Sequence, residues 1–128
     1  MKILILGAGR VGSSLASTLS RQEYEVSIVD LNKDKLLRLQ EDCDLATEIG
    51  HASHPVTLEK AGADEETIVL AVTNSDECNI TSCQIAKSKF NVKKTICRLS
   101  DASYLESLEA FGKDNIDIAI GPENEVTE

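Results

Sequence analysis

A chain of 128 residues is close to the commonest size for a single domain with one core. Hydrophobic residues make up 41% of the chain and charged residues 27%, which is typical of a soluble globular protein. The net charge of −9 disfavours nucleic acid and anionic lipid as partners, because an acidic surface repels phosphate. No apolar run approaches the roughly 18–20 residues that span a bilayer, and no signal peptide is recognisable. We therefore expect a cytoplasmic protein.

Strands and helices are expected to alternate from the first residues onward. In chain order, the first half of the sequence predicts a strand at Ile3–Leu6, a helix at 10–21, a strand at Val26–Asp30, a helix at 33–42 and a strand at Leu45–Ile49. The first helix is indicated by apolar residues at helical spacing, among them Val11, Leu15 and Leu19. Asn32 is a suitable N-cap for the second helix.

The second half continues the alternation, and its elements again come in chain order. The expected elements are a short helix from Pro55 to Gly62, a strand at Thr67–Val72, a helix at 77–89, a strand at Thr95–Arg98, a helix at 104–111 and a strand at Ile116–Ile120. Asp76 is predicted to cap the helix at 77–89, with Ile80, Cys83 and Ala86 on its inward face. This alternation is typical of the α/β class, with a parallel sheet between helices on both faces. We predict a Rossmann-type doubly wound sheet of six strands in the order 3-2-1-4-5-6, forming one domain over residues 1–128.

A glycine-rich turn follows the first predicted strand. It reads Gly7-Ala8-Gly9-Arg10-Val11-Gly12, opens a predicted helix, and precedes a strand that ends in Asp30. Asp30 lies 18 positions after Gly12, near the spacing of about 20 found in dinucleotide-binding folds. Gly7 permits the tight turn, Gly9 lets a pyrophosphate approach the backbone, and Gly12 lets the helix pack closely. The amides at the start of the helix attract phosphate.

The carboxylate of Asp30 is suited to accept hydrogen bonds from ribose hydroxyls. It would also repel a 2′-phosphate, so NAD(H) is predicted as the ligand, with ATP or ADP as the alternative and NADP disfavoured. Arg10, inside the phosphate loop, adds a fixed positive charge and a bidentate donor for phosphate oxygens. The alternative for Arg10 is an ordinary solvated arginine at a helix start.

Other candidate binding residues lie at the ends of the remaining predicted strands. They are His51, Ala52, Thr73, Asn74, Glu77 and Arg98. The loop at 73–77 flanks the crevice where the order of a doubly wound sheet reverses. The turn at 50–52 lies where an adenine is expected, although an ordinary strand-to-helix turn explains it equally well. Arg98 could point into the same crevice or form a surface ion pair.

These motifs together resemble the N-terminal domain of the TrkA potassium-uptake subunits, the RCK or KTN family. The resemblance covers essentially the whole chain. Its distinctive segments are Met1-Lys2-Ile3 leading into the glycine turn, Val29-Asp30, Gly50-His51-Ala52, Ala71-Val72-Thr73-Asn74-Ser75-Asp76-Glu77 with Asn79, Cys83-Gln84-Ile85-Ala86-Lys87, and Arg98. By analogy, the nucleotide contacts are the loop from Gly7 to Val11, Asp30, Ala52, the pair Thr73 and Asn74, and Arg98.

The resemblance also implies a role and partners. It implies a regulatory subunit that lies at the inner face of the cell membrane through its partner, a potassium-translocating membrane protein that it gates. It further implies pairing of the domains into dimers or larger rings. The family usually continues with a crossover helix and a C-terminal ligand domain, which we expect to be absent from this chain.

An NAD-dependent oxidoreductase is the main alternative, because such enzymes hold their cofactor with the same turn. Catalysis would need a general acid or base near the nicotinamide, and the two histidines, His51 and His54, lie on the adenine side of the predicted sheet. A methyltransferase using S-adenosylmethionine fits less well, since its glycine loop usually lacks the third glycine in this register. A metal site from His51, His54 and Cys43 is disfavoured by Pro55, and the four cysteines, which show no CxxC spacing, are expected to be reduced. No catalytic residue and no metal ligand is predicted.

Overall fold

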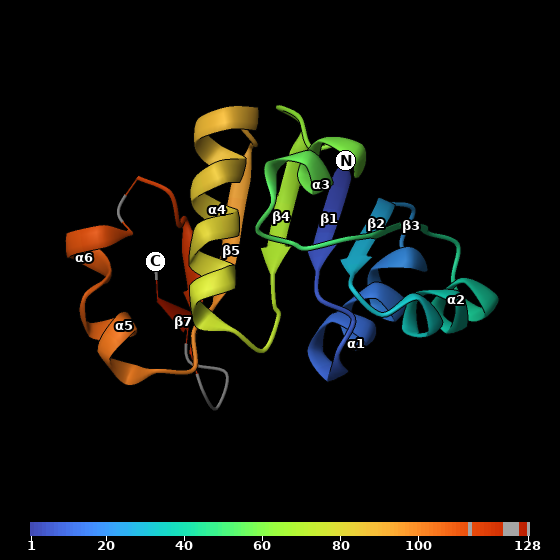
Figure 1. Ribbon diagram of the computed structural model, residues 1–128, viewed down its shortest axis with the longest axis horizontal. Helices are drawn as coiled ribbons and strands as arrows, with labels where there is room; N and C mark the ends of the chain where they lie inside the picture. Colours follow the sequence, from blue (N-terminus) through green and yellow to red (C-terminus); the bar gives the residue numbers. More distant parts are fainter. Residues whose placement is uncertain (113, 122–125, 128) are drawn as a thin grey trace.

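The fold is a twisted, mostly parallel sheet with helices on both of its faces (Figure 1). The computed structural model describes residues 1–112, 114–121 and 126–127. Its strands are β1 (Lys2–Leu6), β2 (Glu25–Asp30), β3 (Ala46–Ile49), β4 (Thr67–Ala71), β5 (Lys94–Arg98), β6 (Ile118–Ile120) and β7 (Val126–Thr127). They lie in the order β3-β2-β1-β4-β5-β6-β7, and β1 to β6 are parallel. The predicted Rossmann-type order 3-2-1-4-5-6 is confirmed.

Strand β7 adds an antiparallel edge that the sequence did not predict. Its two residues pair with the end of β6, Val126 opposite Ile120 and Thr127 opposite Ala119. Two residues are too few to produce the alternation over four or more positions by which a strand is recognised in a sequence.

Helices connect the parallel strands in the way a doubly wound sheet requires. They are α1 (Arg10–Ser20), α2 (Lys33–Asp42), α3 (Pro55–Lys60), α4 (Asp76–Phe90), α5 (Ala102–Glu106) and α6 (Leu108–Phe111). As predicted, Asn32 caps α2, because its side chain accepts a hydrogen bond from the amide of Lys35 at 3.2 Å. None of the described helices is long and apolar enough to cross a membrane.

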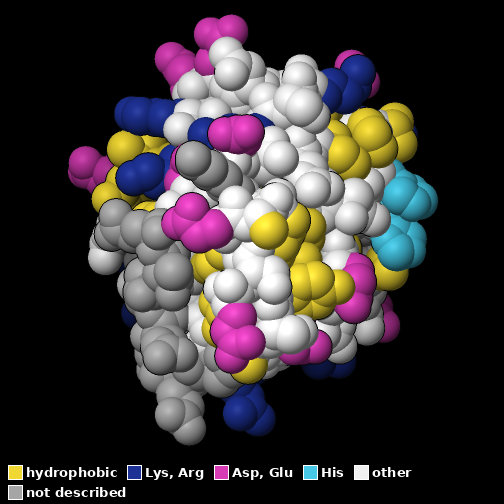
Figure 2. Space-filling model, turned by 90° about the vertical axis from the view of Figure 1, so that its left-hand side faces the viewer, with side chains coloured by type: hydrophobic (Ala, Val, Ile, Leu, Met, Phe, Trp, Pro, Cys, Tyr) yellow, Lys and Arg dark blue, Asp and Glu magenta, His cyan; other side chains and the backbone are white. Residues whose placement is uncertain are grey.

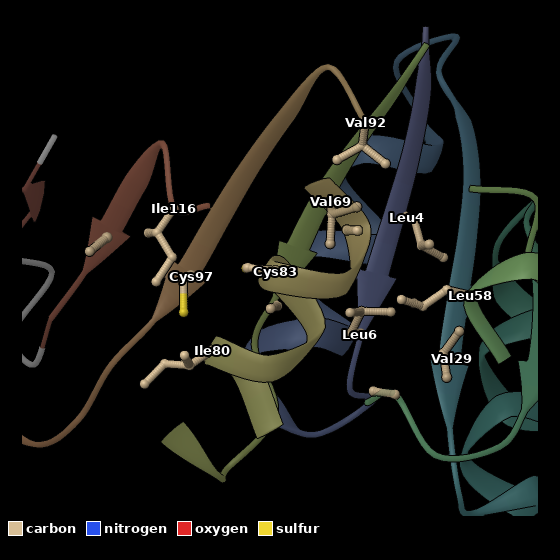
Figure 3. Packing of buried hydrophobic residues seen from close by; sticks show 14 of the residues in the cluster. Leu4, Leu6, Val29, Leu58, Val69, Ile80, Cys83, Val92, Cys97 and Ile116 are labelled. Atoms are coloured by element: carbon tan, nitrogen blue, oxygen red, sulfur yellow. The ribbon is translucent and has the colours of Figure 1, made fainter. Parts of the chain in front are cut away.

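The core consists of two aliphatic clusters, one on each face of the sheet. Alternate residues of β1 enter opposite clusters, Leu4 and Leu6 on one face and Ile3 and Ile5 on the other. The first cluster is closed by α3 and α4, and Figure 3 shows Leu58, Ile80 and Cys83 packing onto the strands there. The second is closed by Ala16 of α1 and Leu36 of α2. Each buried leucine or isoleucine contributes about 1.5–3 kcal/mol, so a strand buried on both faces anchors the loop that follows it.

Two helix predictions were wrong in detail. Ser75, not Asp76, caps α4: its hydroxyl accepts from the amide of Cys78 at 3.2 Å. Serine and aspartate are equally good N-caps, so adjacent candidates cannot be ranked by residue type. The single helix expected over 104–111 is two short ones, because the backbone at Ser107 leaves the helical region (φ −102°, ψ 7°). The apolar spacing continues across this break and therefore did not reveal it.

Candidate functional site

A cleft of about 410 Å³ opens at the carboxyl ends of the central strands, where the strand order reverses. Its volume is within the range of pockets that hold small ligands. The predicted site residues that line it are Gly7, Gly9, Arg10, Val11, Asp30, Thr73, Asn74 and Arg98. The structure therefore brings together residues from the turn after β1 and from the ends of β2, β4 and β5.

The three glycines of the turn have different reasons to be glycine. Gly7 has a φ of +108°, in the region that side chains rarely adopt. A Cβ on Gly12 would lie 1.7 Å from the carbonyl oxygen of Gly7, so α1 can pass the turn only without a side chain there. A Cβ on Gly9 would meet nothing within 4 Å, and its φ of −77° is ordinary. The fold thus requires Gly7 and Gly12, whereas Gly9 leaves space at the cleft.

The start of α1 presents free backbone amides to the cleft. Its N-cap, Gly9, provides no side-chain cap, and the first turn holds no acidic residue. The first intrahelical bond from the turn is that of the Ser13 amide to the Gly9 carbonyl at 2.9 Å. The amides of Arg10, Val11 and Gly12 therefore have no partner within the helix, and they lie at the positive end of its dipole. This arrangement attracts an anion such as phosphate.

Asp30 lies at the end of β2 and holds the turn in place. One carboxylate oxygen accepts from the Ala8 amide and the other from the Asn32 amide, both at 2.8 Å. Each oxygen keeps a lone pair that can accept from a ribose hydroxyl. Ala8 was predicted as a nucleotide contact; in the structure it is buried and its amide donates to Asp30.

A buried asparagine of α4 organises the opposite wall of the cleft. The side-chain oxygen of Asn79 accepts from the amide of Thr73 at 2.9 Å and from its hydroxyl at 2.7 Å. Its side-chain nitrogen donates to the carbonyls of Thr73 at 3.1 Å and Arg98 at 2.9 Å. The Asn79 side chain is completely buried, so these four bonds fix the ends of β4 and β5 relative to each other. The guanidinium of Arg98 adds a long contact of 3.5 Å to the Thr73 carbonyl.

Five predicted site residues do not line the cleft: Ala8 and Gly12 of the glycine turn, described above, and His51, Ala52 and Glu77. His51 is exposed, and its ring stacks on that of His54 with centroids 4.6 Å apart; Figure 2 shows the two histidine side chains together at the surface. Ala52 is buried in the core, where its carbonyl accepts from the Ser82 hydroxyl at 3.0 Å. Glu77 lines a neighbouring hollow on the outer side of the loop at 73–77. A strand-end position in the sequence does not reveal in which direction the following turn leads.

The hollow beside Glu77 is acidic. Glu77 accepts a hydrogen bond of 3.4 Å from the Tyr104 hydroxyl, and its negative charge raises the pKa of that tyrosine. The carboxylate of Asp76 accepts from the amides of Ser100 at 2.9 Å and Asp101 at 2.8 Å, tying the start of α4 to the loop after β5. Asp76 therefore stabilises the loop that carries Ser100 rather than capping its own helix.

Two residues that line the cleft were missed in the sequence, Lys35 and Val72. Val72 directly follows β4 and looked like part of the strand. Lys35 lies in the first turn of α2, five positions after Asp30. A basic residue in the turn after the ribose-binding carboxylate is a signal that could have been used, but its direction depends on how α2 packs.

Among the described residues, no group of three or more His, Cys, Asp and Glu side chains could hold a metal ion, and all four cysteines are free.

The strand order, the glycine turn and the carboxylate at the end of β2 define a domain of the Rossmann nucleotide-binding class. Within that class the sequence matches the TrkA-N domain family over residues 3–122, and the chain belongs to this family. The resemblance stated from the motifs is thereby confirmed.

Curated relatives carry the same family name. The chain is 44% identical to the Trk system potassium uptake protein TrkA of Vibrio alginolyticus, over 99% of this chain and 28% of the relative. It is 41% identical to the protein of that name from Haemophilus influenzae, over 100% of this chain and 29% of the relative. The chain thus spans less than a third of the length of these relatives.

Solved structures share the fold at low sequence identity. The NAD(P)-binding domain of an exopolyphosphatase-related protein from Archaeoglobus fulgidus superposes with a TM-score of 0.78 at 19% identity, covering 94% of this chain and 86% of that one. The AMP-bound form of the Kef CTD from Shewanella denitrificans gives 0.75 at 22% identity, covering 91% and 70%. The GsuK channel bound to NAD gives 0.69 at 21% identity, covering 87% and 20%.

Proposed function

We propose that this chain is the regulatory nucleotide-binding domain of a potassium-uptake system, with an adenine nucleotide, NAD(H) or ATP/ADP, held in the cleft. The observation that carries the proposal is the space in front of Gly9, beside the free amides of α1 and opposite Asp30. A diphosphate fits against the amides and a ribose against the carboxylate. The relatives named TrkA support the link to potassium uptake.

The proposed role is to gate a potassium-translocating membrane subunit from the cytoplasmic side. A nucleotide can do this only if it binds two arrangements of the domains with different affinity. The domain would work as a homodimer or in a larger ring, in which occupancy of each cleft favours one arrangement. The GsuK channel bound to NAD contains a part with the same fold, which makes up 20% of that chain.

The cleft offers little for chemistry on a substrate. The groups lining it that can ionise are Arg10, Asp30, Lys35 and Arg98. Both oxygens of Asp30 are already bonded to backbone amides, and arginine does not act as a base at neutral pH. Lys35 lies in the first turn of α2, on the ribose side of the site rather than beside the expected nicotinamide. A hydride-transfer enzyme needs a proton donor or acceptor beside the nicotinamide. We therefore propose a binding role without catalysis.

A thermal-shift panel tests the proposed ligand class. At a nucleotide concentration about 100-fold above Kd, NAD, NADH, ATP or ADP should stabilise the fold by about 2.7 kcal/mol. That corresponds to a rise in Tm on the order of 10 °C for a domain of this size. Adenosine and inorganic pyrophosphate, each tested alone, are the controls and should give smaller shifts. If none of the four nucleotides raises Tm, the proposed function is wrong.

Variants of Asp30 separate its contribution to the stability of the fold from its contribution to ligand binding. The sequence alone suggests that Asp30→Ala leaves the fold intact, but the bonds to Ala8 and Asn32 predict a loss of about 1–3 kcal/mol in the free energy of unfolding. Asp30→Asn keeps one acceptor oxygen and should lose less. Both variants should bind NAD more weakly than the wild type, which calorimetry measures. Wild-type affinity for NAD in a destabilised Asp30→Ala protein would restrict Asp30 to a structural role.

A further inference from the structure

A second hollow, of about 350 Å³, adjoins the nucleotide cleft between α1 and α2. We call it the α1–α2 hollow; its lining includes Arg10, Ser13, Lys35, Arg38 and Asp42. Arg10 and Lys35 line the cleft as well, so the two spaces meet at these side chains. Nothing in the proposed binding of a simple adenine nucleotide uses Arg38.

The α1–α2 hollow is positively charged on an acidic protein. It gathers three cations and one carboxylate, whereas the whole chain has 13 basic and 22 acidic residues. In the part of the chain that the structure describes, the ion pairs within 4.0 Å are Lys2–Asp64 and Lys87–Asp117. Arg10, Lys35 and Arg38 form none there. Three cations around one hollow without an internal partner point to an anionic ligand.

The position of the three basic side chains determines which part of a bound nucleotide would lie beside them. The ribose is expected at Asp30, and α2 begins three residues later at Lys33. A diphosphate lying on the α1 amides would extend away from α2, toward Thr73 and Arg98 at the ends of β4 and β5. Lys35 and Arg38 therefore lie on the ribose side of the site rather than beside the end of a polyphosphate chain.

The expectation from the sequence that Asp30 repels a 2′-phosphate is weakened by the structure, because Asp30 opposes a phosphate on the ribose less strongly than an isolated carboxylate would. Each of its oxygens already accepts a backbone amide, from Ala8 and from Asn32. Hydrogen bonds of this kind compensate part of a carboxylate's charge. The ammonium of Lys35, which lines the same cleft, offsets more of it.

We propose that the α1–α2 hollow is a subsite for a phosphate on the 2′ or 3′ oxygen of the adenosine ribose, bound by Lys35 and Arg38. The inference rests on the proposed function, because the ribose must first lie in the cleft. Such a phosphate carries a charge of about −1.5 to −2 at neutral pH. The subsite would therefore favour adenine nucleotides that are phosphorylated on the ribose as a ligand class of this domain.

Calorimetric titration with three small probes tests the subsite. The probes are 5′-AMP, adenosine 2′,5′-bisphosphate and adenosine 3′,5′-bisphosphate, and the two bisphosphates distinguish the two ribose positions. The wild type should bind one bisphosphate at least as tightly as 5′-AMP. Lys35→Gln and Arg38→Gln should each weaken that bisphosphate by about fivefold or more, as expected for one charge pair near 4 Å. In Arg38→Gln, binding of 5′-AMP should change by less than about twofold, because Arg38 lines the α1–α2 hollow and not the nucleotide cleft. Lys35 lines both spaces, so Lys35→Gln should weaken the bisphosphate more than it weakens 5′-AMP.

Lys33→Gln is the matched control. Lys33 is an exposed lysine in the same turn of α2, it lines neither hollow, and its loss changes the net charge equally. Its bisphosphate-to-AMP ratio of Kd should equal that of the wild type. Bisphosphates that bind far more weakly than 5′-AMP to the wild type, or ratios that are the same in Lys35→Gln and Lys33→Gln, would overturn the subsite. Absence of 5′-AMP binding to the wild type would instead overturn the proposed function and the subsite with it.

Discussion

Replacement of Gly12 by alanine is expected to lower the free energy of unfolding by about 3 kcal/mol or more. The added Cβ would lie 1.7 Å from the carbonyl oxygen of Gly7 and 2.8 Å from its carbonyl carbon. These are backbone atoms, so no side chain can rotate to relieve the contact, and α1 must move away from β1. Urea denaturation followed by circular dichroism measures the loss.

Gly9→Ser is the matched variant in the same turn. Its side chain would enter open space, and serine suits the N-cap position better than glycine. The free energy of unfolding without ligand should therefore stay within about 0.5 kcal/mol of the wild type. The same side chain would occupy the approach to the α1 amides, so the Kd for NAD should rise at least about tenfold. A Gly9→Ser protein with unchanged affinity for NAD would place the ligand elsewhere.

Asn79→Asp is expected to destabilise the protein by about 3 kcal/mol or more at neutral pH. The variant keeps the shape and one acceptor oxygen of Asn79. It replaces the donor to the carbonyls of Thr73 and Arg98 with a carboxylate oxygen, in a place that is completely buried. The second carboxylate oxygen would face the carbonyl oxygens of Thr73 and Arg98 with no donor to compensate it.

The pH dependence identifies the cause of this loss. Burial beside two carbonyls should raise the folded-state pKa of the new carboxyl group above its unfolded value. The folded state then binds the proton more tightly, so the stability of Asn79→Asp should increase as the pH is lowered through the raised pKa. Asn74→Asp, in the exposed part of the same loop, should change stability by less than about 0.5 kcal/mol. A similar loss in both variants would contradict the assigned role of Asn79.

Asn79 also connects the cleft to more distant parts of the fold. It fixes Thr73 and Arg98, which line the cleft, while Asp76 one turn earlier on α4 holds the amides of Ser100 and Asp101. A ligand that contacts Thr73 or Arg98 therefore acts on residues held by α4, the helix that also holds the loop leading into α5. Such a connection is a physical route from the cleft to the loop before α5.

The strand order and the glycine turn could be predicted because their signals are local. Apolar runs such as Ile3–Leu6 and Thr67–Val72 are bounded by turn residues, and their alternation with helical spacing leaves few arrangements of the sheet. The separate roles of Gly7, Gly9 and Gly12 follow from their spacing. The structure confirms the tight turn at Gly7, through its positive φ, and the close backbone approach at Gly12. It leaves open space at Gly9, where the approach of a pyrophosphate stays a prediction.

The rest of the site depends on directions that the sequence does not encode locally. His51 and Ala52 follow β3 as expected, yet the turn there carries one outward and the other into the core. Lys35 reaches the cleft only because α2 packs beside α1. The four hydrogen bonds of Asn79 join residues that are 6 and 19 positions away, so no short motif could show that this polar side chain would be buried.

A crystal structure grown with NAD tests the central claim most directly. The account predicts diphosphate oxygens within about 2.7–3.2 Å of the amides of Arg10, Val11 or Gly12. It also predicts a ribose hydroxyl donating to the carboxylate of Asp30. A dinucleotide bound elsewhere on the protein, with the space before Gly9 filled only by solvent, would contradict it.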